Sequence, residues 1–343
     1  MNHSEFFTAL RNGKIEKCYL FEGPEEFTKR SALDALRKQV TAGDFAAMND
    51  VRLQDPPPDE LIAAVETLPF MSDKRFVEVR GCTLLTGEKT KDYDESKAVE
   101  RYQDYFLDLP ESTCLVFYVR GKADSRKKMY QLLKKRATVV TFDALKDDEL
   151  TRWIAKRLDG FGKKISYACC QQLWFSAGKE LTMLANELDK LASYMGERTE
   201  VTPADIDAVC VKSVEYKVFD LSDALLSGKG NKALSMLDAL LTDGEERLMI
   251  LSVLGRQCRQ LHYAAAMAAA GKKQPQIAAE LGLPDFVAGK TLNLARRYAP
   301  AQLKRMAQLC TETEYLVKSG QMMEQGSVEK VMLQIMGLGK EHT

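Results

Sequence analysis

Cys18-Tyr19-Leu20-Phe21-Glu22-Gly23-Pro24-Glu25-Glu26 is a short apolar run that leads into a turn, and it decides how the first part of the chain folds. From Phe27 onward the apolar spacing becomes helical, so the stretch predicts a strand, a loop and a helix in succession. Many nucleotide-binding proteins carry the motif G-x-x-x-x-G-K-S/T at such a junction, where its lysine holds the β- and γ-phosphates.

This loop lacks the residues that would bind phosphate. Gly23 is its one glycine, and Glu-Phe-Thr-Lys stands where the lysine and the hydroxyl residue of the motif should follow. The carboxylates of Glu25 and Glu26 would repel a phosphate group. We therefore expect the architecture of a phosphate loop without ATP binding. The alternative is an ordinary strand, turn and helix unrelated to nucleotides.

The first segment, residues 1–145, alternates strand-like and helical stretches. Helices are predicted between the strands, for example at 27–40 and 58–66. Such alternation predicts a largely parallel sheet with helices on both faces, which is an α/β domain. The predicted strands are 17–22, 49–53, 75–80, 113–119 and 137–142.

The rest of the chain shows helical spacing throughout. Residues 146–212 predict a small domain of three helices, and residues 213–343 predict an all-α bundle. Thr202, Pro203 and Asp205 form a typical helix start, with a capping hydroxyl, a first-turn proline and a first-turn carboxylate. We therefore expect one α/β domain followed by two helical domains.

Composition excludes several classes of protein. The 343 residues carry 49 Lys+Arg and 49 Asp+Glu, so no net charge attracts the chain to DNA or to an anionic membrane. No segment reaches the length of a membrane span, and the first residues lack the layout of a secretion signal. The eight cysteines and three histidines show no metal-ligand spacing, and no catalytic constellation stands out. We expect no cofactor, no metal, and free cysteines in the reducing cytoplasm.

Residues 67–79, Thr-Leu-Pro-Phe-Met-Ser-Asp-Lys-Arg-Phe-Val-Glu-Val, resemble the delta subunit of the bacterial DNA polymerase III clamp loader. That family carries a leucine-proline-aromatic run, a basic pair and a strand at this point. Three further stretches resemble the family in the same order, at 187–194, 218–226 and 254–261. The resemblance covers nearly the whole chain. It implies an AAA+-like first domain, a helical lid domain over 146–212 and a helical collar over 213–343.

The resemblance also implies a function. A delta subunit binds the sliding clamp, the beta subunit, and opens its ring or holds it open for loading onto primed DNA. It does not hydrolyse ATP itself, although it works with ATPase and delta-prime-type subunits as a component of the DNA polymerase III holoenzyme, a DNA-directed DNA polymerase (nucleotidyltransferase).

Two alternatives stay open. One is an ATP-binding AAA+ remodeller, which would need a working phosphate loop. The other is the second clamp-loader subunit without ATPase activity, which usually carries zinc-binding cysteines and a Ser-Arg-Cys motif. Ser125-Arg126-Lys127 is the nearest approach to that motif here.

Residues 68–71 are the candidate for binding a partner. Pro69 breaks the helix predicted at 58–66, and Phe70 and Met71 then precede a charged stretch at 72–75. A protruding apolar pair rimmed by charge is typical of a binding anchor. The resemblance assigns clamp binding to Phe70 and Met71, with Leu68 supporting them from the core. The alternative is that all three side chains fill the core of their own domain.

Two groups of basic residues are candidates for contacts with DNA or with other subunits. The first group lies on a predicted helix at 125–136. The second group is two arginines, spaced one helical turn apart on a predicted helix of the bundle. The alternative for both is an ordinary solvated face. The candidate residues are Arg126, Lys127, Lys128, Lys134, Lys135, Arg256 and Arg259.

Overall fold

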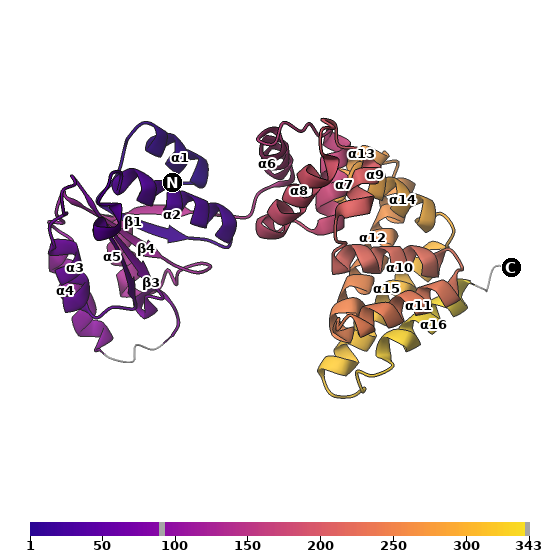
Figure 1. The fold of residues 1–343 in the computed structure, drawn as a ribbon. Coiled ribbons are helices and arrows are strands. Elements are labelled where there is room, and N and C mark those ends of the chain that lie inside the picture. Colours follow the sequence, from indigo (N-terminus) through magenta and orange to yellow (C-terminus); the bar gives the residue numbers. More distant parts are fainter. Residues whose placement is uncertain (89–92, 340–343) are drawn as a thin grey trace. The chain divides into compact units, whose positions relative to one another are not determined.

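The computed structural model describes residues 1–88 and 93–339. The chain divides into two compact units, Met1–Asp148 and Glu149–Thr343. Figure 1 shows the fold of each unit. The division of the helical part near residue 212 stays a prediction.

A parallel sheet forms the centre of the first unit. Among the described residues it has five strands, in the order β2-β3-β4-β1-β5, and every neighbouring pair is parallel. β1 and β4 are buried along their whole length, which explains why both appear in the sequence as unbroken apolar runs. The strands are β1 (Cys18–Glu22), β2 (Asp50–Gln54), β3 (Arg75–Arg80), β4 (Thr113–Tyr118) and β5 (Thr138–Thr141).

Helices cover both faces of this sheet. On one face, Phe6 of α1 (His3–Arg11) and Leu33 of α2 (Glu26–Val40) pack in one core with inward residues of β1, β3 and β4. On the other face, α3 (Pro58–Glu66), α4 (Glu95–Tyr105) and α5 (Lys128–Arg136) share a second core with the opposite sides of the same strands. Figure 1 shows α1 and α2 on one side and α3 and α4 on the other. The predicted α/β fold class is confirmed.

Two short 3-10 turns adjoin strands of the sheet. The first, η1 (Ala46–Asn49), leads directly into β2, and the second, η2 (Thr83–Leu85), follows β3. Because Asn49 belongs to η1, β2 begins one residue later than the predicted 49–53.

The second unit is built of helices, as predicted, with one isolated β-bridge between Lys164 and Glu200 among its described residues. Residues 146–212 contain four helices instead of the predicted three. The helix start predicted at Thr202 begins the short α9, with a reciprocal cap between Thr202 and Asp205. Leu254 in the long α12 lies in a core with residues of α10, α11, α15 and α16. The first four helices are α6 (Asp147–Asp159), α7 (Tyr167–Ala177), α8 (Leu181–Met195) and α9 (Pro203–Val209). The others are α10 (Val214–Leu226), α11 (Gly230–Thr242), α12 (Arg247–Ala269), α13 (Gln274–Leu281), α14 (Asp285–Ala295), α15 (Pro300–Lys318) and α16 (Ser327–Gly339).

The cysteines agree with the expectation from composition. All eight cysteines are free and buried, so they pack as small core residues. Within residues 1–88 and 93–339, no helix combines the length and the apolar character needed to cross a membrane.

Candidate functional site

The loop between β1 and α2 is held closely against the neighbouring strands. Gly23 has φ +120°, and its N–H donates to the Gly121 carbonyl at 2.7 Å. A Cβ atom at Gly23 would lie 2.2 Å from the carbonyl oxygen of Phe142, so no other residue fits there. The Glu25 N–H also donates to the Phe142 carbonyl, at 3.0 Å. The loop is therefore fixed by its own backbone hydrogen bonds.

Lys29 fills this loop from within. Its side chain is fully buried, and its Nζ donates to the carbonyls of Gly23 at 2.8 Å and Val119 at 2.7 Å. The same ammonium lies 2.6 Å from Glu26 Oε1 and 5.0 Å from the centre of the Tyr118 ring. Phosphate-binding loops direct backbone N–H groups at an anion, whereas here a loop carbonyl accepts from a cation. The sequence did not predict this role for Lys29, because a lysine on a helix usually faces solvent.

Glu25 and Glu26 occupy the start of α2, where a bound phosphate would otherwise lie. The Glu25 carboxylate accepts from the Phe27 N–H at 3.0 Å and so caps the helix. Glu26 accepts from the Tyr118 hydroxyl at 2.7 Å and from the Gly121 N–H at 3.0 Å. Burial alone would raise the pKa of Glu26, but hydrogen bonds from Lys29, Tyr118 and Gly121 together lower it below its ordinary value.

We expect the isolated chain not to bind ATP. The loop presents two carboxylates at the helix start and a buried ammonium that is already hydrogen-bonded. Isothermal titration with Mg-ATP should show no heat of binding. A dissociation constant of about 1 µM, equivalent to about 8 kcal/mol of binding free energy, would contradict this account of the loop.

Acid should weaken the fold partly through Glu26. Its pKa is lowered in the folded chain, so the unfolded chain binds more protons as the pH falls through about 4.3, the ordinary value for glutamate. The free energy of unfolding therefore decreases as the pH drops through and below this value. The free energy of unfolding, measured by urea titration between about pH 6 and pH 3, should fall less steeply with pH for Glu26→Gln than for the parent chain. Equal slopes would show that Glu26 does not contribute.

An exposed apolar segment follows α3. The exposed fractions are 78% for Leu68, 50% for Phe70 and 76% for Met71. The expectation that Leu68 packs in the core is wrong, because Leu61 and Val65 already complete the buried side of α3 and the chain leaves the helix after Glu66. The alternative that all three side chains fill the core is contradicted as well.

A second segment adds apolar side chains beside this one. Phe45 and Met48, around the turn η1, are exposed, and the Phe45 ring meets the Phe70 ring edge-on at 5.3 Å between centroids. The side chain of Asn49, fully buried, hydrogen-bonds to the backbone of Phe70. We call Phe45, Met48, Leu68, Phe70 and Met71 the apolar tip. Sequence reasoning missed Phe45, Met48 and Asn49, since no periodic pattern connects them to residues 68–71.

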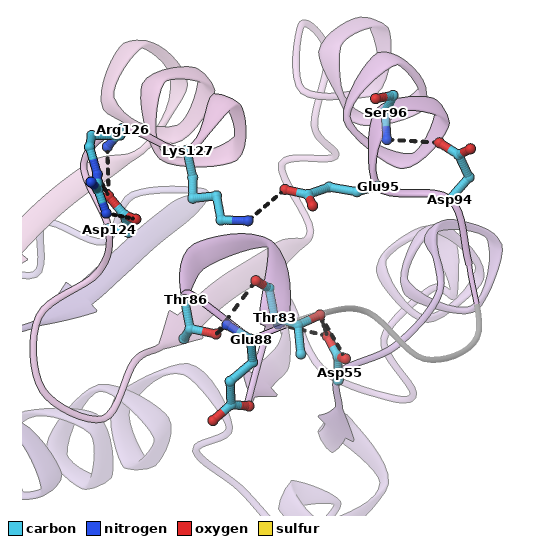
Figure 2. Close-up of polar contacts among 10 residues, drawn as sticks. All are labelled: Asp55, Thr83, Thr86, Glu88, Asp94, Glu95, Ser96, Asp124, Arg126 and Lys127. Atoms are coloured by element: carbon cyan, nitrogen blue, oxygen red, sulfur yellow. Dashed lines mark hydrogen bonds and ion pairs between the residues drawn. The ribbon is translucent and has the colours of Figure 1, made fainter.

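Two of the predicted basic contacts already have acidic partners. Figure 2 shows the Arg126 guanidinium against the Asp124 carboxylate, with both N–O distances 2.9 Å. Lys127 precedes α5 and reaches Glu95 at 2.9 Å. The side-chain hydrogen bond from Arg126 lowers the pKa of Asp124 to about 2. Lys128, Lys134 and Lys135 are exposed, and no ion pair holds them within the described ranges. These three are the stronger candidates for contact with phosphate.

Arg256 and Arg259 lie in different surroundings although both belong to α12. Arg256 is exposed and lines a cavity of about 550 Å³ together with Trp174 and Phe219. Arg259 is half-buried and donates to the Thr311 hydroxyl of α15 at 3.4 Å. Arg259 therefore contributes to packing between α12 and α15, while Arg256 keeps its charge at the surface. Contacts of either residue with DNA or with subunits stay predictions.

Comparisons with known proteins agree with this architecture. Two family models match the chain: the DNA polymerase III delta subunit model over residues 19–143 and the model of its C-terminal domain over residues 215–335. The DNA polymerase III subunit delta of Bacillus subtilis is 26% identical over 335 residues, which cover 97% of this chain and 96% of the relative. The subunit of the same name from Escherichia coli is 28% identical over 147 residues, covering 42% of this chain and 43% of the relative.

A solved structure is similar over the same length. The DNA clamp loader delta protein of Bacillus subtilis superposes with a TM-score of 0.53 at 25% sequence identity, covering 98% of this chain and 99% of the solved one. Similarity in sequence and in fold thus extends from the sheet to the last helices. The chain belongs to the family of DNA polymerase III delta subunits.

Proposed function

We propose that this chain binds the sliding clamp and opens its ring, or holds it open, for loading onto primed DNA. The observation that carries the proposal is the exposure of Phe70 and Met71 on a backbone fixed by Asn49. Exposed apolar side chains with charged neighbours fit the anchor role of a protein interface. Met71 adapts its shape to a pocket, and Phe70 supplies a large rigid area.

The chain acts through binding and does not hydrolyse ATP in this proposal. A closed ring under strain opens once its open state is favoured, so the delta subunit need only bind that state more tightly. The filled loop at Lys29 supports the division of labour, in which ATPase and delta-prime-type subunits use ATP and this chain contacts the clamp. The complex works on the chromosome, so we place it in the cytoplasm.

Contact with DNA or with neighbouring subunits is proposed for the exposed basic residues. Lys128, Lys134 and Lys135 lie on one short helix with their charges available. Such charges attract phosphate without reading sequence. Arg256 is available in the same way in the second unit.

Release of a clamp from DNA tests the proposed opening. A labelled sliding clamp is first loaded onto nicked circular DNA, and the purified full chain is then added without nucleotide. We expect clamp release to be accelerated, because a closed ring leaves a circle only when it opens. A matched sample with Phe70→Ala plus Met71→Ala should release clamp at the spontaneous rate. Equal rates with and without the parent chain would contradict the opening role.

Assembly is expected to depend on the last helices. Residues 213–343 have an apolar core of their own around α12. A fragment of these residues should therefore fold alone and co-purify with the ATPase subunits, but it should not bind the clamp. Pull-downs with each partner check both expectations. Clamp binding that stays with the fragment would contradict the placement of the binding site in the first unit.

A further inference from the structure

Asn49 joins the two segments of the apolar tip through three hydrogen bonds. Its Nδ2 donates to the carbonyl of Phe70 at 2.8 Å and to the carbonyl of Phe45 at 3.2 Å. Its Oδ1 accepts from the N–H of Phe70 at 2.7 Å. One fully buried amide thus satisfies both backbone groups of Phe70. A carboxamide supplies two N–H donors and one carbonyl acceptor, which are the three groups that these hydrogen bonds use.

The other hydrogen bonds of the segment after α3 do not reach the Phe70 peptide: Thr67 bonds back to Ala63, and the remaining two are made by Ser72 and Lys74. Residues 67–74 lie outside helices and strands, and Met71 has φ +50°, a region that non-glycine residues rarely adopt. Leu68 and Met71 are mostly exposed, so their side chains add little packing. The hydrogen bonds to Asn49 are therefore what holds the Phe70 peptide in this conformation.

The turn η1 contributes apolar side chains to the apolar tip, in addition to the side-chain amide of Asn49. The rings of Phe45 and Phe70 meet at an interplanar angle of 82°, an arrangement that aromatic pairs favour. Met48 is exposed on the same turn, and its carbonyl accepts from Arg75 Nη1 at 3.3 Å. Phe45 is therefore held against Phe70, and Met48 adds an exposed apolar side chain on the same turn.

We propose that the clamp-binding surface is made of both segments, with Asn49 as the positioning residue that fixes Phe70 before the clamp arrives. The occupant is the sliding clamp, offering an apolar depression to Phe70 and Met71 and a flatter apolar rim to Phe45 and Met48. This inference rests on the proposed function, because it assigns the same partner to a larger surface. Continuity favours that partner: the Phe45 and Phe70 rings adjoin edge-on, so a protein that covers Phe70 also meets Phe45.

Asn49→Ala tests the positioning role. If the binding conformation of the Phe70 segment falls to about a tenth of the molecules, the dissociation constant for the clamp rises about tenfold. The Phe70 amide should also exchange its hydrogen faster, because its acceptor Oδ1 is gone. Should Asn49→Ala not fold, Asn49→Asp gives the same comparison, since it keeps the acceptor but loses both donor bonds.

A buried hydroxyl of the same domain gives the matched control. Thr83→Val removes the hydrogen bonds from Thr83 Oγ1 to Asp55 without touching the apolar tip. We expect it to lower the melting temperature but to leave clamp affinity unchanged. If Asn49→Ala binds the clamp as tightly as Thr83→Val at equal stability, Asn49 is only structural and the positioning role is wrong.

Phe45→Ala tests the larger surface. Phe45 is partly exposed, so the variant should fold, and its clamp affinity should fall several-fold as expected for a residue beside a binding hot spot. In a double-mutant cycle with Phe70→Ala the two losses should not add, because the rings touch. Unchanged affinity in Phe45→Ala, with affinity lost in Phe70→Ala plus Met71→Ala, overturns the larger surface and keeps the proposed function. Affinity kept in that double variant overturns the proposed function itself.

Discussion

Replacing Phe70 and Met71 together with alanine should abolish clamp binding and leave the fold nearly unchanged. Both side chains are exposed, so their truncation creates no internal cavity, and each should change stability by at most about 0.5 kcal/mol. As central anchors they should contribute about 2 kcal/mol of affinity each. If the two losses add, binding becomes about a thousandfold weaker.

Melting temperature and clamp affinity, measured on the same double variant, separate the possible outcomes. Leu107→Ala is the matched control, because Leu107 is an exposed apolar residue of the same unit that lies outside the apolar tip. The control should keep both stability and affinity. Unchanged affinity in a well-folded double variant would place the clamp-binding surface elsewhere, and Leu68, also highly exposed, would be the next residue to test.

Lys29→Met should destabilise the first unit strongly. The substitution leaves the carbonyls of Gly23 and Val119 without their buried donor and leaves Glu26 without its ion-pair partner. Each buried carbonyl left without its donor costs about 1–3 kcal/mol of unfolding free energy. Urea unfolding followed by circular dichroism measures this loss.

The control for Lys29 lies on the same helix. Lys38 is exposed near the end of α2, so Lys38→Met should change the free energy of unfolding by about 0.5 kcal/mol or less. A similarly small change in Lys29→Met would show that the ammonium does not stabilise the loop. A gain of ATP binding in that variant would show instead that Lys29 had been excluding the nucleotide.

The sheet was predictable because its signals are local. Each strand appears as a short apolar run between turns and stretches of helical spacing. These runs predicted all five strands to within one or two residues, and β3 at its observed bounds. α1 was missed, although Asn2 and Glu5 form a reciprocal helix cap that the sequence displays. The helix has only two buried residues, Phe6 and Leu10, so its apolar periodicity is weak and the cap is its main signal.

The candidate site was predictable only in part, because it depends on contacts between distant residues. Phe70 and Met71 stand out in the sequence as an apolar pair after a proline. The exposure of Leu68 depends on where α3 ends, and the role of Asn49 depends on a contact across 21 positions. Lys29 likewise bonds to a carbonyl 90 positions away. No local pattern carries such information, so these roles required the folded chain.

The dissociation constant between the purified chain and the sliding clamp of the same organism, measured without nucleotide, tests the central claim most directly. Biolayer interferometry with immobilised clamp and the full chain in solution suffices. The account predicts saturable binding with a dissociation constant of about 1 µM or tighter, equivalent to at least about 8 kcal/mol. No binding at about 100 µM of a chain shown to be folded would contradict it.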